Sequence, residues 1–250
     1  MIELLRSTSR LAIATFVVVA ALSHAQTGRL NDTGMTSCFS VGSSGLVSCT
    51  AAIYGNSGSL PHQDARYGRD AANPSKVGGG AAGFDFTRIC WNGSPEGTTA
   101  APNPCNGTLI ANTTGTASAT PATDWACTRD NVTGLVWSLQ TQTANWNTAV
   151  GATYPDAGHN TPSRCGAITV GSRWRMPARR ELLGIVHHGA ITSPRVDTAY
   201  FPATQSDDYF AQESVATHAG YSWSVSFDSG SGVISSVFGL YPVRLVRNAP

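Results

Sequence analysis

The sequence has little charge. Aspartate, glutamate, lysine and arginine make up 12% of its 250 residues, about half of the roughly 25% that is usual in globular domains. Glycine, serine, threonine and asparagine are abundant instead. This composition is typical of an extracellular domain that is rich in β-strands and loops.

The sequence also lacks the motifs of common catalytic and metal sites. It contains no G-x-S-x-G, H-E-x-x-H or Walker motif, and no C-x-x-C that would indicate a zinc ribbon or a thioredoxin-type redox site. The stretch GGGAAG at residues 78–83 matches G-x-G-x-x-G, but the strand before it and the helix after it that a dinucleotide site requires are missing from the pattern. We therefore expect a protein that is not an enzyme and that holds no cofactor and no metal.

A single apolar run marks the N-terminus. Arg6 and Arg10 precede the run LAIATFVVVAAL at residues 11–22, and Ala25 ends a cleavage site of small residues. The run is about 12 residues long, whereas a helix that spans a bilayer needs about 20. We therefore predict a secretory signal peptide at residues 1–25 and no membrane span. The expected location of the exported chain is periplasmic, cell-surface or extracellular.

The predicted mature chain carries no net charge. Loss of Glu3, Arg6 and Arg10 from 15 acidic and 16 basic residues leaves 14 of each. A nucleic-acid reader needs a basic surplus over a whole face, so we expect no nucleic-acid partner. The segment RWRMPARR at residues 173–180 nevertheless gathers four arginines. It is either a structural corner between a strand and a helix, or a small cluster that holds sulfate or carboxylate through bidentate bonds.

Six cysteines form an even set in a chain predicted to be exported, which favours three disulfides over metal ligands. Sequence alone allows about 15 pairings of six cysteines. We favour the sequential set because its first two pairs close short loops rich in Gly, Ser and Pro. The predicted pairs are Cys38 with Cys49, Cys90 with Cys105, and Cys127 with Cys165.

The mature chain divides into three regions. Residues 26–60 are turn-rich and hold the first cysteine pair, and residues 61–123 are dominated by Gly, Pro, Asn, Thr and Ala with few periodic apolar positions. Periodic patterns become clear only in residues 124–250. We therefore predict a small disulfide-bearing N-terminal segment, a loop-rich extension and a core domain.

The core region begins and ends with strand patterns and has helix patterns between them. The best-defined helix has Pro177 in its first turn, one apolar face and Gly189 at its C-cap. This order predicts an α+β fold. The predicted elements are a strand, turn and strand at residues 125–139, a short helix at 143–154, the longer helix at 172–189, a hairpin at 221–239 and a closing strand at 241–248.

Several motifs together resemble one known family. The stretch RWRMPARRELLGIV at residues 173–186 is similar to the core motif of the Lcl C-terminal domain family, also known as domain of unknown function 1566, which is named for a bacterial collagen-like adhesin. Five further stretches resemble family signatures in the expected order. They are QDARYGRDA at 63–71, GFDFTRI at 83–89, CTRDNVTGLVW at 127–137, VDTAYFPAT at 196–204 and VRLVR at 243–247.

The resemblance implies a C-type-lectin-like fold of the kind shared with formylglycine-generating enzymes. It implies a twisted antiparallel sheet with one or two helices, a disulfide between Cys127 and Cys165, and a buried Trp174 at the arginine-rich corner. It also implies that the loops between Thr204 and Tyr221 form a variable ligand face. A fold of this class does not itself fix the ligand.

For that ligand face we predict aromatic and imidazole groups that stack or hydrogen-bond, a polar rim and two arginines. The candidate residues are Tyr209, Tyr221, His218, Asp207, Asp208, Glu213, Arg175 and Arg179. The two adjacent aspartates do not have the spacing of a calcium loop.

The family resemblance and the missing catalytic motifs favour an exported, adhesin-like domain that binds a glycan or a surface protein. The main alternative is a structural component of a surface appendage or matrix, with protein contacts only and possible homo-oligomers. A hidden enzyme of the formylglycine-generating type is a third hypothesis, and it would need reactive cysteines. A diversified recognition protein of the lectin-like class is a fourth.

Overall fold

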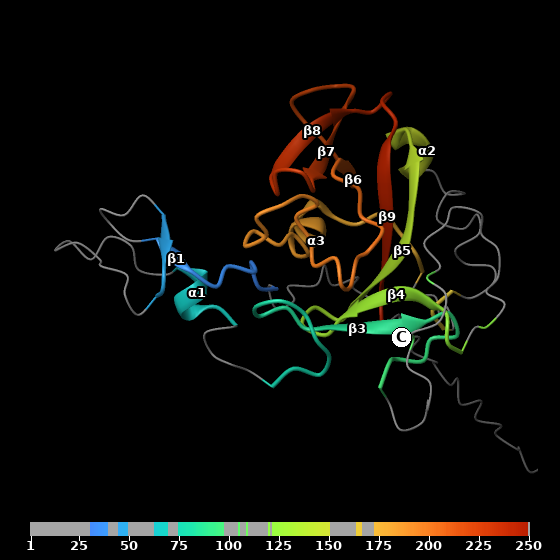
Figure 1. Ribbon diagram of the computed structural model, residues 1–250. Coiled ribbons are helices and arrows are strands. Elements are labelled where there is room, and N and C mark those ends of the chain that lie inside the picture. The colour runs from blue at the N-terminus through green and yellow to red at the C-terminus, as the bar shows by residue number, and fades with distance from the viewer. Residues whose placement is uncertain are drawn as a thin grey trace, which may run out of the picture.

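The fold was obtained as a computed structural model, which describes residues 31–39, 45–49, 63–69, 75–97, 105, 109, 120, 122–150, 164–166 and 173–249. The predicted signal peptide lies outside these residues. The described chain contains two larger antiparallel sheets, a small two-stranded sheet and short helices (Figure 1). The predicted α+β class is confirmed at this level.

The first sheet has four strands in the order β3-β4-β5-β9. They are β3 Phe86–Cys90, β4 Trp125–Asp130, β5 Leu135–Ala144 and β9 Tyr241–Asn248. All three neighbouring pairs are antiparallel. Strands β4, β5 and β9 match the predicted strand, turn and strand and the predicted closing strand, and β3 lies in the region that we predicted to be rich in loops.

The turn between β4 and β5 is fixed by a buried aspartate. Asp130 accepts hydrogen bonds from the backbone N–H groups of Val132 and Thr133 and from the Thr133 hydroxyl. Gly134 follows with φ 74°, a left-handed conformation that glycine adopts without steric cost. Burial raises the pKa of Asp130, although these hydrogen bonds oppose the shift. The sequence DNVTG therefore determines this turn locally.

The second sheet has three strands in the order β6-β7-β8. They are β6 Asp208–Ser214, β7 Tyr221–Ser226 and β8 Gly232–Ser236. Strands β7 and β8 form the predicted hairpin, whereas β6 occupies a segment that we expected to be a loop. Strand β6 also contacts β9, so the two sheets adjoin along these strands.

The helices are short. They are α1 Asp64–Tyr67, α2 Trp146–Val150 and α3 Arg179–Leu183. The short helix predicted over residues 143–154 is confirmed at Trp146–Val150, whereas residues 143–144 belong to β5 and residues 151–154 lie outside the described ranges. The long helix predicted over residues 172–189 is wrong in extent, because only α3 is helical there.

Two interactions limit α3. Upstream, Arg175 exchanges backbone hydrogen bonds with Val246 of β9, so the chain before the helix is extended. Downstream, Gly184 rather than Gly189 is the C-cap, and the His187 N–H donates to the Arg195 carbonyl instead of continuing the helix. Backbone partners far away in the sequence therefore replace the local helical bonds.

The apolar side chains form two buried clusters, one on each face of the β5–β9 pair. Alternation along each strand divides the residues between the clusters: Trp137 and Val246 enter one, and Val136 and Leu245 enter the other. The first cluster also contains Leu182 of α3. Full burial of such a side chain stabilises the fold by about 1.5–3 kcal/mol. The central strands thus have no solvent-exposed face in this region.

Three disulfides join all six cysteines. They link Cys38 with Cys49, Cys90 with Cys105, and Cys127 with Cys165, as predicted. Structural disulfides form and persist in oxidising compartments. Three of them in one chain therefore indicate a periplasmic or extracellular environment.

The glycine-rich stretch that matches G-x-G-x-x-G extends the edge of the first sheet. Gly79 exchanges two backbone hydrogen bonds with Phe86, and the N–H groups of Val77 and Gly78 donate to the Asp85 carboxylate. A Cβ on Gly78 would collide with the Phe86 carbonyl. The glycines therefore permit close approach of two backbones.

The N-terminal region docks on the core through a glycine. Strands β1 Cys38–Phe39 and β2 Leu46–Val47 form the two-stranded sheet. Before them, Gly34 has φ 77° and lies against the ring of His187, and the Thr33 carbonyl accepts a hydrogen bond from the His188 N–H.

Substitution of Gly34 by alanine is expected to undock this region. The added Cβ would collide with the His187 ring and would require a positive φ, so we expect a loss of about 1–3 kcal/mol. Hydrogen exchange of residues 31–39 measures the effect. Gly45→Ala is the matched control, because nothing lies within 4 Å of its Cβ position. Equal protection in the two variants would contradict the docking contact.

Removal of the disulfide between Cys127 and Cys165 is expected to destabilise the core domain. The bridge spans 38 residues of sequence, and loss of such a constraint on the unfolded chain costs about 2–4 kcal/mol. Denaturant unfolding of the Cys127→Ser/Cys165→Ser variant measures the loss. The Cys38→Ser/Cys49→Ser variant is the control, because that bridge closes the small sheet outside the core and spans 11 residues. A smaller loss in the core variant than in this control would contradict the prediction that the disulfide between Cys127 and Cys165 stabilises the core domain.

Candidate functional site

The arginine-rich segment links the two large sheets. Arg175 pairs with Val246 of β9 through N–H to carbonyl bonds of 3.0 and 2.9 Å, and the Pro177 carbonyl accepts the Gln212 N–H of β6 at 2.9 Å. Trp174 is buried at 2% exposure, as the resemblance implies. Residues 174–178, called the linking segment below, therefore bond to a strand of each sheet.

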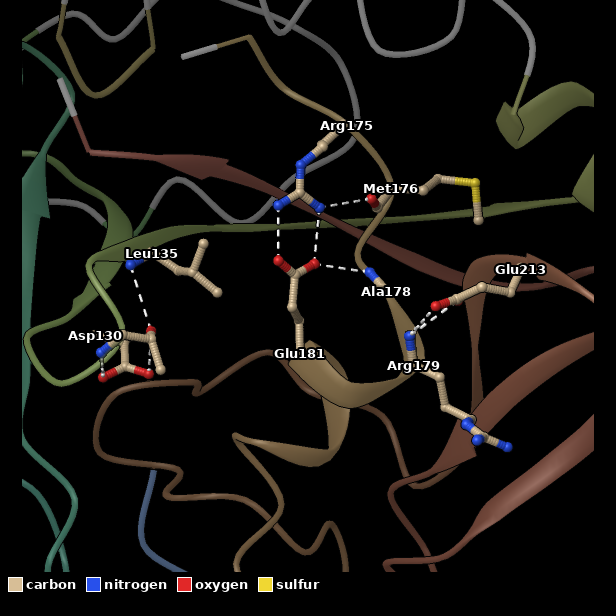
Figure 2. A network of polar contacts seen from close by, with 9 residues as sticks. Asp130, Leu135, Arg175, Met176, Ala178, Arg179, Glu181 and Glu213 are labelled. Atoms are coloured by element: carbon tan, nitrogen blue, oxygen red, sulfur yellow. Dashed lines mark hydrogen bonds and ion pairs between the residues drawn. The ribbon is translucent and has the colours of Figure 1, made fainter. Parts of the chain in front are cut away.

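A bidentate ion pair fixes the turn from the linking segment into α3. The two terminal nitrogens of Arg175 donate to the two carboxylate oxygens of Glu181, each at 2.7 Å (Figure 2). The same Glu181 carboxylate accepts the Ala178 N–H at 2.7 Å, and Arg175 also donates to the Met176 carbonyl. The charge of Arg175 is thus neutralised within the segment, which is the structural role that we weighed against anion binding.

Glu181 stays ionised in this setting. Burial by itself would raise its pKa, but the hydrogen bonds and charge of Arg175 and the Ala178 N–H outweigh burial and lower the pKa below the ordinary 4.5. Arg175 and Glu181 therefore form a charge-assisted ion pair that fastens the linking segment to α3.

A second acid, Glu213 of β6, meets the first residue of α3. The Arg179 N–H donates to the Glu213 carboxylate, at 2.9 Å to the nearer oxygen. The Arg179 side chain extends away from that carboxylate (Figure 2), and its guanidinium carbon lies 4.0 Å from the ring centroid of Trp223 in β7. A guanidinium on an indole face is a favourable cation–π contact.

An open groove of about 440 Å³ lies beside this arrangement. Its walls come from α2, the linking segment and β6. The lining residues are Ala149, Val150, Arg175, Met176, Gln212 and Glu213. The volume falls within the range of about 300–1,000 Å³ that is usual for small-ligand sites.

An aromatic surface continues from Arg179 over the second sheet. Trp223 pairs with Ile234 across the β7–β8 ladder, and Tyr221 lies two residues from Trp223, so these three side chains share one face. Tyr221 and Ile234 are 41% and 42% exposed. The His218 ring approaches Tyr221 edge-on, with 6.3 Å between centroids. These four side chains are called the aromatic surface below. Arg179 connects this surface to the groove, because its guanidinium lies on Trp223 and its N–H donates to Glu213.

The structure brings together Arg175 and Glu213 at the groove, and Tyr221 and His218 on the aromatic surface. Arg179 lies between the two, with its N–H on Glu213 and its guanidinium on Trp223. It places the remaining candidates elsewhere. Tyr209 is fully buried among core residues, where its ring packs against Phe227, so its ring is out of reach of a surface ligand.

The two adjacent aspartates begin the opposite end of β6. Asp207 is exposed, and Asp208 accepts a hydrogen bond from the Ser235 hydroxyl. They do not line the groove. In the part of the chain that the structure describes, no three His, Cys, Asp or Glu side chains gather where they could share a metal ion.

The sequence interpretation missed Trp223, Gln212 and Met176. The signal for Trp223 was present in the alternation of YSWSVS, which places Tyr221 and Trp223 on one face. Gln212 and Met176 lie on elements that bond to each other, and no spacing in the sequence predicts that contact.

The fold and site define a disulfide-stapled, antiparallel α+β domain with a surface groove between α2, the linking segment and β6. The sequence model of the Lcl C-terminal domain family matches residues 126–247. This match covers β4 through most of β9 and both walls of the groove that β6 and the linking segment provide. Residues 126–247 are therefore an Lcl C-terminal domain, as the sequence motifs indicated.

No curated protein matches the chain. None of the helices in the described ranges is long and apolar enough to cross a membrane.

Acid should weaken the ion pair of the linking segment. The pKa of Glu181 is lower in the folded chain than the ordinary 4.5. The stability that this group contributes is thus present above about pH 4.5 and is lost as the pH falls through the lowered value. We expect the free energy of unfolding to decrease less between pH 6 and pH 3, as a rough range, in Glu181→Gln than in the unchanged protein.

A double-mutant cycle of Arg175→Ala and Glu181→Ala tests the same contact. Arg175 is partly exposed, with 38% of its side chain accessible, so a coupling energy of about 1 kcal/mol is expected. The pair Arg88 and Glu96, at 3.7 Å, is the control and should couple more weakly. No coupling between Arg175 and Glu181 would show that the bidentate contact adds nothing to stability.

Proposed function

We propose that this protein is an exported, non-enzymatic ligand-binding domain of adhesin type that recognises a glycan or a cell-surface partner. The observation that carries the proposal is the groove and its continuation through Arg179 onto the aromatic surface. Polar groups beside partly exposed aromatic rings suit sugars, whose faces are apolar and whose edges are hydroxylated.

A C-type-lectin-like fold is part of this proposal. The Lcl C-terminal domain resembles that class, and the aromatic surface lies on the three-stranded sheet β6-β7-β8, next to the segment where the resemblance implies a ligand face. The three disulfides, which suit an oxidising compartment, support export. They also engage all six cysteines, so no thiol is available for chemistry of the formylglycine-generating kind.

A second candidate function is protein contact alone, in an appendage or matrix. It is favoured by the apolar side chains at the end of the β7–β8 hairpin. Phe238 and Leu240 are 78% and 68% exposed, and Phe238 lies next to Gly220, beside Tyr221. Exposed apolar patches of this kind often mark protein interfaces. Under this reading the protein self-associates or binds a protein, and glycans do not bind.

Substitution of Trp223 by alanine tests the primary proposal. We expect the affinity for glycans that bind on a broad array to fall at least about tenfold, equivalent to 1.4 kcal/mol, because the platform under Arg179 is removed. Ile191→Ala, at a side chain that is 94% exposed and distant in sequence from the surface, is the control. Thermal unfolding of both variants separates lost binding from lost folding.

The array result also separates the two candidate functions. Absence of binding to every glycan, together with concentration-dependent self-association on a sizing column, would overturn the glycan proposal in favour of protein contact. Glycan binding that Trp223→Ala leaves unchanged would place the site elsewhere on the molecule.

A further inference from the structure

The groove has few polar groups that are open to a ligand. Arg175 lines it, but both terminal nitrogens of its guanidinium are engaged by Glu181, and one of them also donates to the Met176 carbonyl. The ion pair has no net charge. Arg175 therefore contributes its aliphatic stem and little positive potential to the groove.

The open acceptor in the groove is Glu213. A carboxylate has about four lone-pair positions, and the two oxygens of Glu213 share a single N–H donor, that of Arg179. The side chain is half-buried and lines the groove. It can thus accept further hydrogen bonds from a ligand without losing its structural bond.

Gln212 adds a group of mixed character. Its backbone N–H bonds to the Pro177 carbonyl, whereas its exposed side chain lines the groove with an amide that can both donate and accept. Ala149, Val150 and Met176 supply apolar surface beside these two groups. The groove therefore offers a carboxylate, an amide and an apolar wall.

Because Arg175 is paired with Glu181, the net charge that the lining residues present to the groove is the negative charge of Glu213. The cation of Arg179 does not compensate it within the groove, since the guanidinium lies on Trp223 and extends away from the Glu213 carboxylate (Figure 2). A ligand sulfate or carboxylate in the groove would face a like charge in partly excluded solvent, which is repulsive. A hydroxyl would instead donate to Glu213 in a charge-assisted hydrogen bond.

We infer that the groove binds an uncharged, hydroxyl-rich sugar residue, with Glu213 accepting its hydroxyls and Gln212 donating to a neighbouring hydroxyl or ring oxygen. This inference rests on the proposed glycan-binding function and names the ligand class for the same site. The apolar wall of Val150 and Met176 contacts the C–H face of the sugar, and sulfated or carboxylated sugars are rejected by charge.

The test uses the exported protein on an array that displays neutral oligosaccharides beside their sulfated or carboxylated counterparts, at about 0.15 M ionic strength. We expect neutral glycans to bind at least about tenfold more tightly than the matched anionic ones. In Glu213→Gln, which keeps an oxygen to accept the Arg179 N–H, neutral-glycan affinity should fall about tenfold and the discrimination against anionic glycans should shrink.

Asp207→Asn is the matched control, because it removes one negative charge from the beginning of the same sheet outside the groove. It should leave both affinities unchanged. Anionic glycans that bind as tightly as neutral ones, or an unchanged affinity in Glu213→Gln, would overturn the inference while the glycan-binding function stands. Silence on the whole array would overturn the glycan-binding function on which the inference rests.

Discussion

The backbone hydrogen bonds of the linking segment, residues 174–178, are the constraint on which the rest of the core depends. Arg175 pairs with Val246 of β9, and Pro177 accepts from Gln212 of β6. The same few residues thus bond to one strand of each sheet where the sheets adjoin. Buried backbone groups must be paired, so these bonds set the relative position of the four-stranded and three-stranded sheets and end the extended chain where α3 begins.

The candidate site is a consequence of this constraint. The groove is walled by α2, the linking segment and β6, and the pair of Arg175 with Glu181 fixes the path of the chain into α3. Glu213 then meets the first N–H of that helix, and the Arg179 side chain is left free to cover Trp223. The structural interpretation of the arginine-rich stretch therefore holds for Arg175, and the part that Arg179 plays in binding stays a proposal. Arg175 is committed to the scaffold, whereas Arg179 faces the aromatic surface.

The second sheet shows how tertiary contacts bury a strand on both faces in spite of its alternating polarity. In YSWSVS, polarity alone would bury the aromatic residues and expose the serines. Ser222 and Ser224 are instead fully buried, while Tyr221 is 41% exposed. The pairing of β6 is irregular between Phe210 and Ser214. The Trp146 indole N–H donates to the Ala211 carbonyl, and the Ser222 hydroxyl lies 3.1 Å from the Glu213 carbonyl, to which it can donate. A small hydroxyl suits this position. Trp223 lies on the other face of β7, where it packs against the core cluster that contains Val225, so both faces of β7 are at least partly buried.

The sequence by itself determined the features whose causes are local or covalent. Turn residues set the β4–β5 hairpin at Asp130 and Gly134, short loops favoured the correct cysteine pairs, and the family motifs indicated the Lcl C-terminal domain. Only the tertiary structure decided the extent of α3, the strand character of β6 and the composition of the groove. The reason is physical: each depends on partners from elements that are far apart in the sequence. Val246 holds Arg175 extended, Pro177 draws Gln212 toward the groove, and the core buries Tyr209, and no local periodicity records such contacts.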